Sequence, residues 1–324
     1  MTVVPFVRRR RRLAIFRLAL MLVVLAAVVV ALWTSWDDVA PYLGALTAGN
    51  LALAFLAALV TPFFTMLGWR RLLADLDSTL GIAPAAGVFF VGQLGKYVPG
   101  SIWAVLAQTE MGSRLGVPRR RVGVVGLLAI ALALLSGGVI GLPALPVLIG
   151  RTELGGYAVV AVVLILSVLC YPPLLNWGIR RGLRILRQPP LEHALSGRAI
   201  VVTLLWFTLS WACSGLAVVL VAADVGEGLS ITSPSLLLLA LCGFALSATF
   251  GMISVIFPAG VGVRDGVLAL ILATVMPLAA AAAVAVVIRF LTILVDVLVA
   301  AAGWTWGREH DLIDGGRLEP VDTP

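Results

Sequence analysis

Two short segments of this sequence place charged side chains within apolar stretches. The first, residues 92–101 (GQLGKYVPGS), contains Lys96, which is the only lysine of the chain. The second, residues 257–262 (FPAGVG), is followed closely by Arg264 and Asp265. A charge at membrane depth costs roughly 2.5–3.5 kcal/mol on insertion scales, so it is rarely kept without a use. Both segments are therefore candidate functional sites.

The residue types in both segments suit a phosphate group. Glycine and proline predict that a helix is interrupted there, and that a half-helix begins after each break. A helix N-terminus offers unpaired N–H groups and partial positive charge, and glycine lets a phosphate approach the backbone closely. Lys96 would add a point charge, and Arg264 could bind a phosphate with two parallel hydrogen bonds. The predicted headgroup-binding residues are Gln93, Lys96, Tyr97, Pro99, Gly100, Ser101, Pro258, Gly260, Gly262 and Arg264. A packing kink without a ligand remains the alternative for each break.

A third set of charges lies in the last apolar run. Arg289 and Asp296 are seven residues apart and so share one face of a helix. Asp265 could pair with Arg289, or Arg264 could pair with Asp296. Such pairs either fix helix packing or act as a gate or a proton-coupling element, and the sequence leaves both roles open.

The composition predicts the elements that position these residues. Hydrophobic residues make up 61% of the chain and charged residues 12%, and the mean hydropathy is +1.10. Several apolar runs reach the ~20 residues that cross a bilayer. We predict an all-α, polytopic helical membrane protein with about six full spans and two broken, re-entrant hairpins, at 84–108 and 235–276. The predicted full spans are 13–33, 51–68, 122–149, 157–177, 199–222 and 278–302.

The distribution of arginine predicts the topology. The basic N-terminus, residues 1–12, is placed in the cytoplasm, followed by one transmembrane domain over 13–306 and a polar cytoplasmic tail over 307–324. Arginines flank the stretch 84–108 on both sides, so it should enter from the cytoplasm and return there. The net charge of +7 thus reports orientation in the inner (plasma) membrane and does not indicate nucleic-acid binding.

The two broken stretches look like parts of an inverted repeat. Pro99 and Pro118 are 19 residues apart, as are Pro258 and Pro277, and Gly92 aligns with Gly251 at the same offset. The repeat units would be residues 51–149 and 199–302, running in opposite directions through the membrane. Inverted repeats whose broken helices meet near the midplane are typical of many transporters.

Signatures of catalysis are scarce. The sequence has no HExxH motif and no nucleotide-binding loop, and the glycine-rich run before Arg264 is not followed by GK[ST]. We predict no cofactor and no metal site. The carboxylates that an enzyme could use within the apolar zones are Asp265, Asp296 and Glu110.

The two motifs resemble a known family. The pattern Gly-Gln-x-x-Lys-Tyr-x-Pro-Gly at 92–100, followed by Phe-Pro-Ala-Gly-Val-Gly-Val-Arg-Asp at 257–265, is similar to two signatures of the lysylphosphatidylglycerol synthase transmembrane-region family. The resemblance covers roughly residues 45 to 305. It departs from the family where Asp265 replaces a usual glutamate, and where residues 101–103 (SIW) lack a frequent second glycine.

The resemblance implies a role in moving a modified lipid across the bilayer. Fused members of the family add a soluble aminoacyl-transfer domain that has no counterpart here, so synthase activity is not carried over. We expect a flippase-like transporter for a phosphate-containing lipid, either a modified phospholipid or a polyprenyl-phosphate-linked lipid. The alternatives are a membrane-embedded glycosyl- or headgroup transferase with lipid-linked donors, or a non-transporting partner of a separate lipid synthase. The expected partners are membrane lipids with anionic headgroups.

Overall fold

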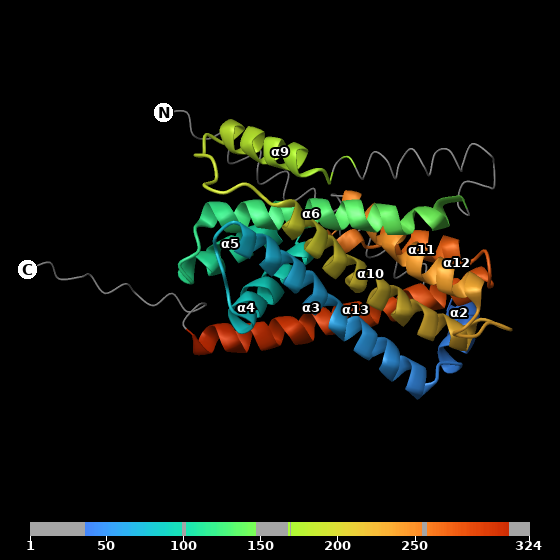
Figure 1. Cartoon of the computed structure of the whole chain (residues 1–324). Helices are drawn as coiled ribbons and strands as arrows, with labels where there is room; N and C mark the ends of the chain where they lie inside the picture. The colour runs from blue at the N-terminus through green and yellow to red at the C-terminus, as the bar shows by residue number, and fades with distance from the viewer. Residues whose placement is uncertain (1–35, 99–101, 147–167, 169, 255–257, 311–324) are drawn as a thin grey trace, which may run out of the picture.

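The structure is a computed structural model of the chain, and it describes residues 36–98, 102–146, 168, 170–254 and 258–310. Every secondary-structure element in these residues is helical (Figure 1). The α-helices are α2 (Trp36–Gly44), α3 (Ala48–Asp75), α4 (Ile82–Gln93), α5 (Trp103–Arg114), α6 (Arg119–Gly141), α9 (Pro172–Ile185), α10 (Gly197–Val225), α11 (Pro234–Ile253), α12 (Val263–Leu272) and α13 (Leu278–Glu309). Three short 3-10 helices, η1 (Leu94–Tyr97), η2 (Leu142–Ala144) and η3 (Pro258–Gly260), complete the described elements. The all-α prediction is confirmed.

Five described helices are long and apolar enough to cross a membrane: α3, α6 with η2, α10, α11 and α13. The predicted spans 51–68, 199–222 and 278–302 lie within α3, α10 and α13. The predicted span 122–149 corresponds to α6 and η2, and its last three residues lie outside the described part. The predicted span 13–33 and most of 157–177 also fall outside the described residues, while α9 covers the end of the latter and continues to Ile185.

Both predicted breaks interrupt a helix, and a new helix begins after each. In the first, α4 and α5 are short helices of 12 residues each, joined through η1. In the second, α11 has 20 residues and is long enough to span, whereas α12 has only 10. The second hairpin is therefore asymmetric, because the run from Pro234 to Ile253 is mostly apolar and carries no charged residue.

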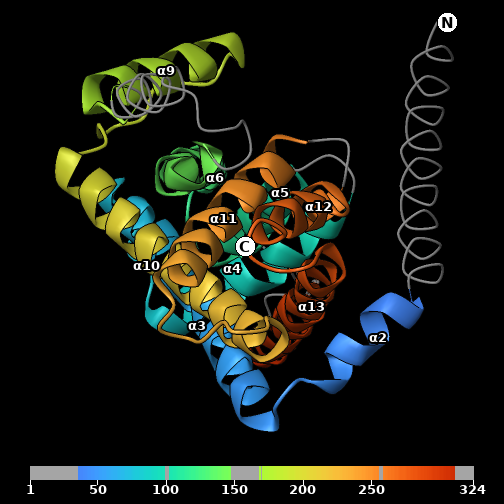
Figure 2. The ribbon, with the colours of Figure 1, turned by 90° about the vertical axis from the view of Figure 1, so that its right-hand side faces the viewer.

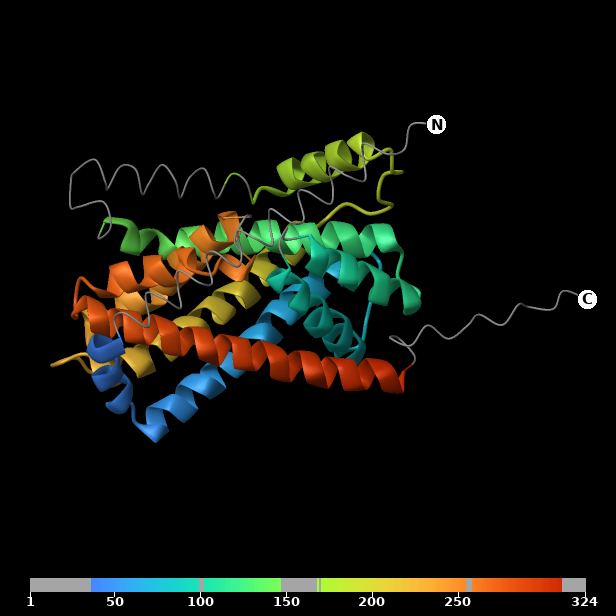
Figure 3. The same cartoon turned by 180° about the vertical axis from the view of Figure 1, so that it is seen from behind.

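The two predicted repeat units run in opposite directions. Helices α3 and α10 pack antiparallel, since Thr61 contacts Ser214 while Thr65 contacts Ser210. Helices α6 and α13 also run in opposite directions, with α4 and α5 at one end of the bundle and α11 and α12 at the other (Figures 1 and 3). Antiparallel directions of the corresponding helices are compatible with an inverted repeat, and the repeat itself stays a prediction.

The residues that suggested the repeat occupy matching places. Pro118 is the N-cap of α6, and Pro277 is the N-cap of α13. Gly92 and Gly251 both lie where the helix before a break touches the half-helix after it. A methyl group on Gly92 would lie 2.5 Å from Gln108 Cγ, and one on Gly251 would lie 3.0 Å from Arg264 Cβ. The common offset thus has a packing reason in both halves.

Charged residues separate to the two ends of the bundle. One end of the bundle holds the α3–α4 and α5–α6 connections (Figure 1). It carries the arginines of α6, α9 and the last turn of α13. Asp224 lies in the last turn of α10, at the opposite end, and Glu227 follows it. At the arginine-rich end, Arg120 and Arg121 both bind Glu192. Viewed along the helices, α2 and α9 lie outside the bundle formed by the long helices (Figure 2).

Candidate functional site

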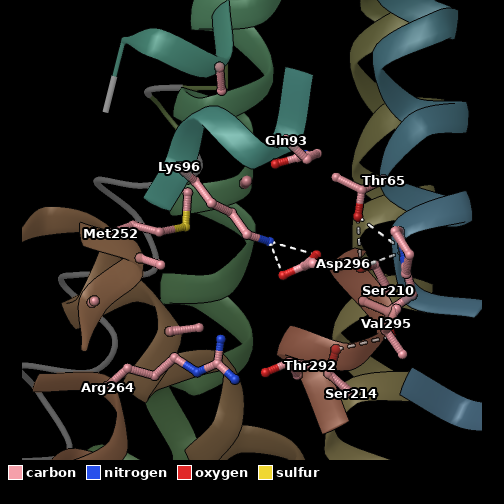
Figure 4. A pocket seen from close by; sticks show the side chains of 18 of the residues that line it. Thr65, Gln93, Lys96, Ser210, Ser214, Met252, Arg264, Thr292, Val295 and Asp296 are labelled. Atoms are coloured by element: carbon pink, nitrogen blue, oxygen red, sulfur yellow. Dashed lines mark hydrogen bonds and ion pairs between the residues drawn. The ribbon is translucent and has the colours of Figure 1, made fainter. Parts of the chain in front are cut away.

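A cavity of about 330 Å³ lies inside the bundle. Its walls come from α3, α4, η1, α5, α6, α10, α11, α12 and α13, so both breaks open onto it. Most of the lining is apolar, and its charged side chains come from η1, α12 and α13 (Figure 4). The charged side chains that line it are Lys96, Arg264, Arg289 and Asp296.

At the first break, Lys96 is held by a carboxylate from the other half of the chain. Lys96 Nζ lies 2.8 Å from Oδ1 and 2.7 Å from Oδ2 of Asp296, and Tyr97 donates a 2.5 Å hydrogen bond to Oδ2 of the same residue. The Asp296 side chain is only 10% exposed. Both of its oxygens are therefore occupied, and the charge of Lys96 is compensated. This arrangement fastens η1 to α13 across the cavity.

Local packing explains how η1 brings these side chains to α13. Gly95 sits directly against the backbone of Ala104 at the start of α5, where a methyl group would collide with Ala104 N. The missing side chain lets α5 approach η1 closely. Lys96 and Tyr97 are then presented to the cavity, whereas Pro99, Gly100 and Ser101 lie outside the described residues.

At the second break, the backbone turns through the left-handed region. The φ angles are +50° at Ala259, +66° at Gly260 and +81° at Gly262. Glycine adopts this region without steric cost, and Gly260 must also lack a side chain because a methyl group there would lie 2.7 Å from Gly251 Cα. Asp265 accepts a 3.1 Å hydrogen bond from the N–H of Gly262 and so caps the first turn of α12.

Arg264, the second residue of α12, differs from Lys96 because no carboxylate among the described residues pairs with it. Its guanidinium lies over the ring of Phe244, at 4.8 Å from the ring centroid. Its Nε and Nη2 atoms are buried and have no hydrogen-bond partner within the described part of the chain. The side chain extends toward α13, into the same space that Lys96 enters from η1 (Figure 4). Buried donors without partners are costly, so an acceptor that reached these two atoms would remove that cost.

Arg289 on α13 is only partly paired, so it is intermediate between Lys96 and Arg264. Its Nη1 donates a 3.0 Å hydrogen bond to Ala259 O and lies 3.9 Å from Asp265 Oδ1, whereas its Nη2 is buried without a partner among the described residues. Of the two pairings left open by the sequence, Asp265 with Arg289 is thus present. Arg264 does not pair with Asp296, because Asp296 binds Lys96 and Tyr97 instead. Arg289 and Asp296 both line the cavity, as their shared helix face predicts.

The sequence interpretation missed a group of uncharged polar residues in the cavity wall. Thr61 and Thr65 on α3 contact Ser214 and Ser210 on α10 at 3.2 and 3.0 Å. Gln108 on α5 lines the cavity and is only 4% exposed. The signal was present, since threonine and serine recur every fourth residue on these two helices and Gln108 ends an apolar run.

The remaining predicted residues divide between the cavity wall and the surface. Gln93, the last residue of α4, and Gly260 line the cavity. Pro258 begins η3, and Gly262 precedes α12, both next to the cavity wall. Glu110 is not part of the site, because it is exposed and pairs with Arg119 at 2.8 Å and Arg114 at 3.8 Å.

The arrangement is suited to binding an anion. Arg264 presents unpaired donors, and hydroxyl and amide groups stand nearby to contact the rest of a polar headgroup. The carboxylates are engaged, Asp296 with Lys96 and Tyr97 and Asp265 with Gly262 and Arg289. Among the described residues, no group of three or more His, Cys, Asp or Glu side chains lies together.

The fold and the cavity define a class: a multi-pass helical membrane protein with a buried cationic site between two broken helices. The model of the lysylphosphatidylglycerol synthase transmembrane region matches residues 15–300 of the chain. The chain belongs to this family, as the two motifs indicated. A comparison with curated proteins found no match. Family membership places the protein in membrane lipid metabolism or transport.

Proposed function

We propose that this protein is a flippase-like transporter that moves a phosphate-containing lipid across the membrane. The observation that supports this most directly is the buried, unpaired guanidinium of Arg264 beside the cavity. A buried guanidinium with two donors that lack acceptors is expensive, even though it is stacked on Phe244. An anionic ligand would supply the missing acceptors, and the family's link to membrane lipids points to a lipid headgroup.

In this proposal the cavity holds the headgroup only. At about 330 Å³ it lies at the small end of the range for ligand pockets, so the acyl or prenyl chains stay in the bilayer. The phosphate contacts Nε and Nη2 of Arg264, and headgroup hydroxyls contact Gln93, Gln108 and the threonine and serine side chains of α3 and α10. Movement of the two repeat units then exposes the cavity to each side of the membrane in turn.

The contacts of the carboxylates favour transport over the transferase alternative. A general base needs an oxygen that is free to accept a proton from a substrate. Both oxygens of Asp296 are held by Lys96 and Tyr97, and Asp265 caps α12 while facing Arg289. Arg264 is therefore the cavity residue to which we assign the main role.

The test is transport of a fluorescent phospholipid in proteoliposomes. We expect the wild-type protein to move the lipid and Arg264→Met to slow it roughly 10- to 100-fold, because a hydrogen bond to a charged group contributes about 1.5–3 kcal/mol. Arg180→Met is the matched control, since Arg180 is exposed on α9 and does not line the cavity. Equal rates for wild type and Arg264→Met would refute the headgroup site. A wild-type protein that moves no lipid would refute transport and favour a partner role beside a synthase.

A further inference from the structure

Among the described residues, the charges around the cavity can be counted, and most of them are paired. Lys96 is compensated by Asp296, and Arg289 lies 3.9 Å from Asp265. Arg264 has no carboxylate within ion-pair distance in the described residues. Three cations thus face two carboxylates, which leaves the site with one net positive charge.

The undescribed residues within the two breaks add no charge to this count. Residues 99–101 (PGS) and 255–257 (VIF) carry no ionisable side chain. The phenol of Tyr97 donates to Asp296 and is neutral in that role. The one excess positive charge is therefore that of Arg264, because Lys96 and Arg289 each face a carboxylate.

We infer that this protein selects headgroups with a single negative charge, and that Asp296 and Asp265 set that preference by neutralising Lys96 and Arg289. The inference rests on the proposed function and narrows its substrate to monoanionic phosphodiesters. One phosphodiester charge is matched by Arg264. A phosphomonoester brings close to two charges, and the second would need Lys96, which Asp296 already holds.

In this geometry Asp296 and Asp265 compete with a headgroup for Lys96 and Arg289. A dianionic headgroup could reach Lys96 only by displacing Asp296, and the displaced carboxylate would then lie buried without its cation. It would also lose the 2.5 Å hydrogen bond from Tyr97. Rejection of the dianion comes from this unpaired charge rather than from the size of the cavity.

The experiment compares two lipids that differ by one methyl group. Phosphatidylmethanol is a monoanion, whereas phosphatidic acid with the same fluorescent acyl chain is close to a dianion at pH 8. We expect wild-type protein in proteoliposomes to move phosphatidylmethanol about tenfold faster than phosphatidic acid, a difference of about 1.4 kcal/mol. Asp296→Asn, which keeps the side-chain shape and an acceptor for Tyr97, should abolish or reverse that ratio.

Two further variants separate charge from shape. Asp265→Asn raises the charge of the site by one through Arg289 without touching Lys96, so it should shift the ratio in the same direction. The double variant Lys96→Met with Asp296→Asn returns the count to one and should restore the wild-type preference. If Asp296→Asn fails to fold, Asp265→Asn and the double variant still decide the question.

The outcomes of the two proposals differ. Equal movement of both lipids by wild-type protein, or a ratio that is unchanged in Asp296→Asn and Asp265→Asn, overturns the charge-selection inference but leaves transport standing. Failure of wild-type protein to move either lipid overturns the proposed function itself. A preference for phosphatidylmethanol that is lost in both asparagine variants and regained in the double variant supports the inference.

Discussion

The two breaks use the same means, a helix interrupted at glycine and proline, but they leave their cations in opposite states. At the first break, Lys96 contacts both oxygens of Asp296. At the second, Arg264 is stacked on Phe244, and two of its nitrogens have no partner among the described residues. The first break is thus fastened to α13, while the second offers a free cation. Two similar motifs can therefore have different roles: the first break holds helices together, and the second has donors that a ligand could bind.

The largest expected difference between the breaks concerns transport. Arg264→Met should lower movement of phosphatidylmethanol roughly 10- to 100-fold, whereas Lys96→Met should lower it by less than roughly tenfold. Both changes remove one charge, but Lys96 is held by Asp296, whereas two donors of Arg264 have no partner among the described residues. Initial rates in proteoliposomes at matched protein content measure the difference. Equal losses would mean that both breaks bind the headgroup alike.

Protein stability should depend more on the Lys96–Asp296 pair than on Arg264, the reverse of the order expected for transport. Asp296→Ala leaves Lys96 unpaired and should lower the free energy of unfolding by about 2 kcal/mol, less than the 3–5 kcal/mol for a fully buried pair, because the Lys96 side chain is 38% exposed. Arg264→Met removes a buried, unpaired charge and should raise it by about 1 kcal/mol. Unfolding in detergent measures both. A loss of stability in Arg264→Met would show that Arg264 has a structural role instead.

The close approaches at the two breaks should be comparably intolerant of a methyl group. Gly95→Ala places Cβ against Ala104 N, and Gly260→Ala places it 2.7 Å from Gly251 Cα at a φ of +66°. Each should cost about 1–3 kcal/mol of stability. Gly266→Ala is the control, because nothing lies within 4 Å of that position on α12, and alanine there should stabilise the helix by about 0.5–1 kcal/mol. If Gly95→Ala were as mild as the control, the packing of η1 against α5 would be wrong.

The sequence revealed the breaks but not how their cations are partnered. Lys96 and Arg264 stand out because a charge within an apolar run is conspicuous, and the half-helices after them are expected from glycine and proline. Lys96 and Asp296 are 200 residues apart, and no local pattern links them. The pairing depends on where η1 meets α13, which is fixed by tertiary packing. The length of α11 was missed for another reason, since apolar residues alone do not show where a hairpin arm ends.

The threonine and serine residues in the cavity wall also show that sequence patterns do not reveal tertiary contacts. Thr61, Thr65, Ser210 and Ser214 look like ordinary small residues of a span, where they often pack between helices. Their position at a cavity is set only by the antiparallel contact of α3 with α10. Polar residues inside spans thus identify candidate sites from sequence, but which of them share a cavity is decided by the fold.

The smallest effect is expected outside both breaks, in the clasp of Glu192 with Arg120 and Arg121. A hydrogen bond from its own backbone, then the Arg121 and Arg120 guanidinium groups, hold the pKa of Glu192 below its usual value. The stabilisation it gives is therefore present above the usual glutamate pKa, and is lost as pH falls through the lowered pKa of the folded protein. Glu192→Gln should remove that acid-side loss and lower stability at pH 7 only slightly, less than any change above.

Salt distinguishes this exposed clasp from the pair in the cavity. Exposed charges are screened at physiological ionic strength, where the Debye length is about 8 Å, whereas a pair whose carboxylate is only 10% exposed is screened less. The difference in unfolding free energy between wild type and Glu192→Gln should therefore shrink as salt is added, and that between wild type and Asp296→Ala should not. The same salt dependence for both pairs would mean that the Lys96–Asp296 contact is as open to solvent as the clasp. Lys96 could then exchange Asp296 for a headgroup without the penalty that makes the first break different from the second.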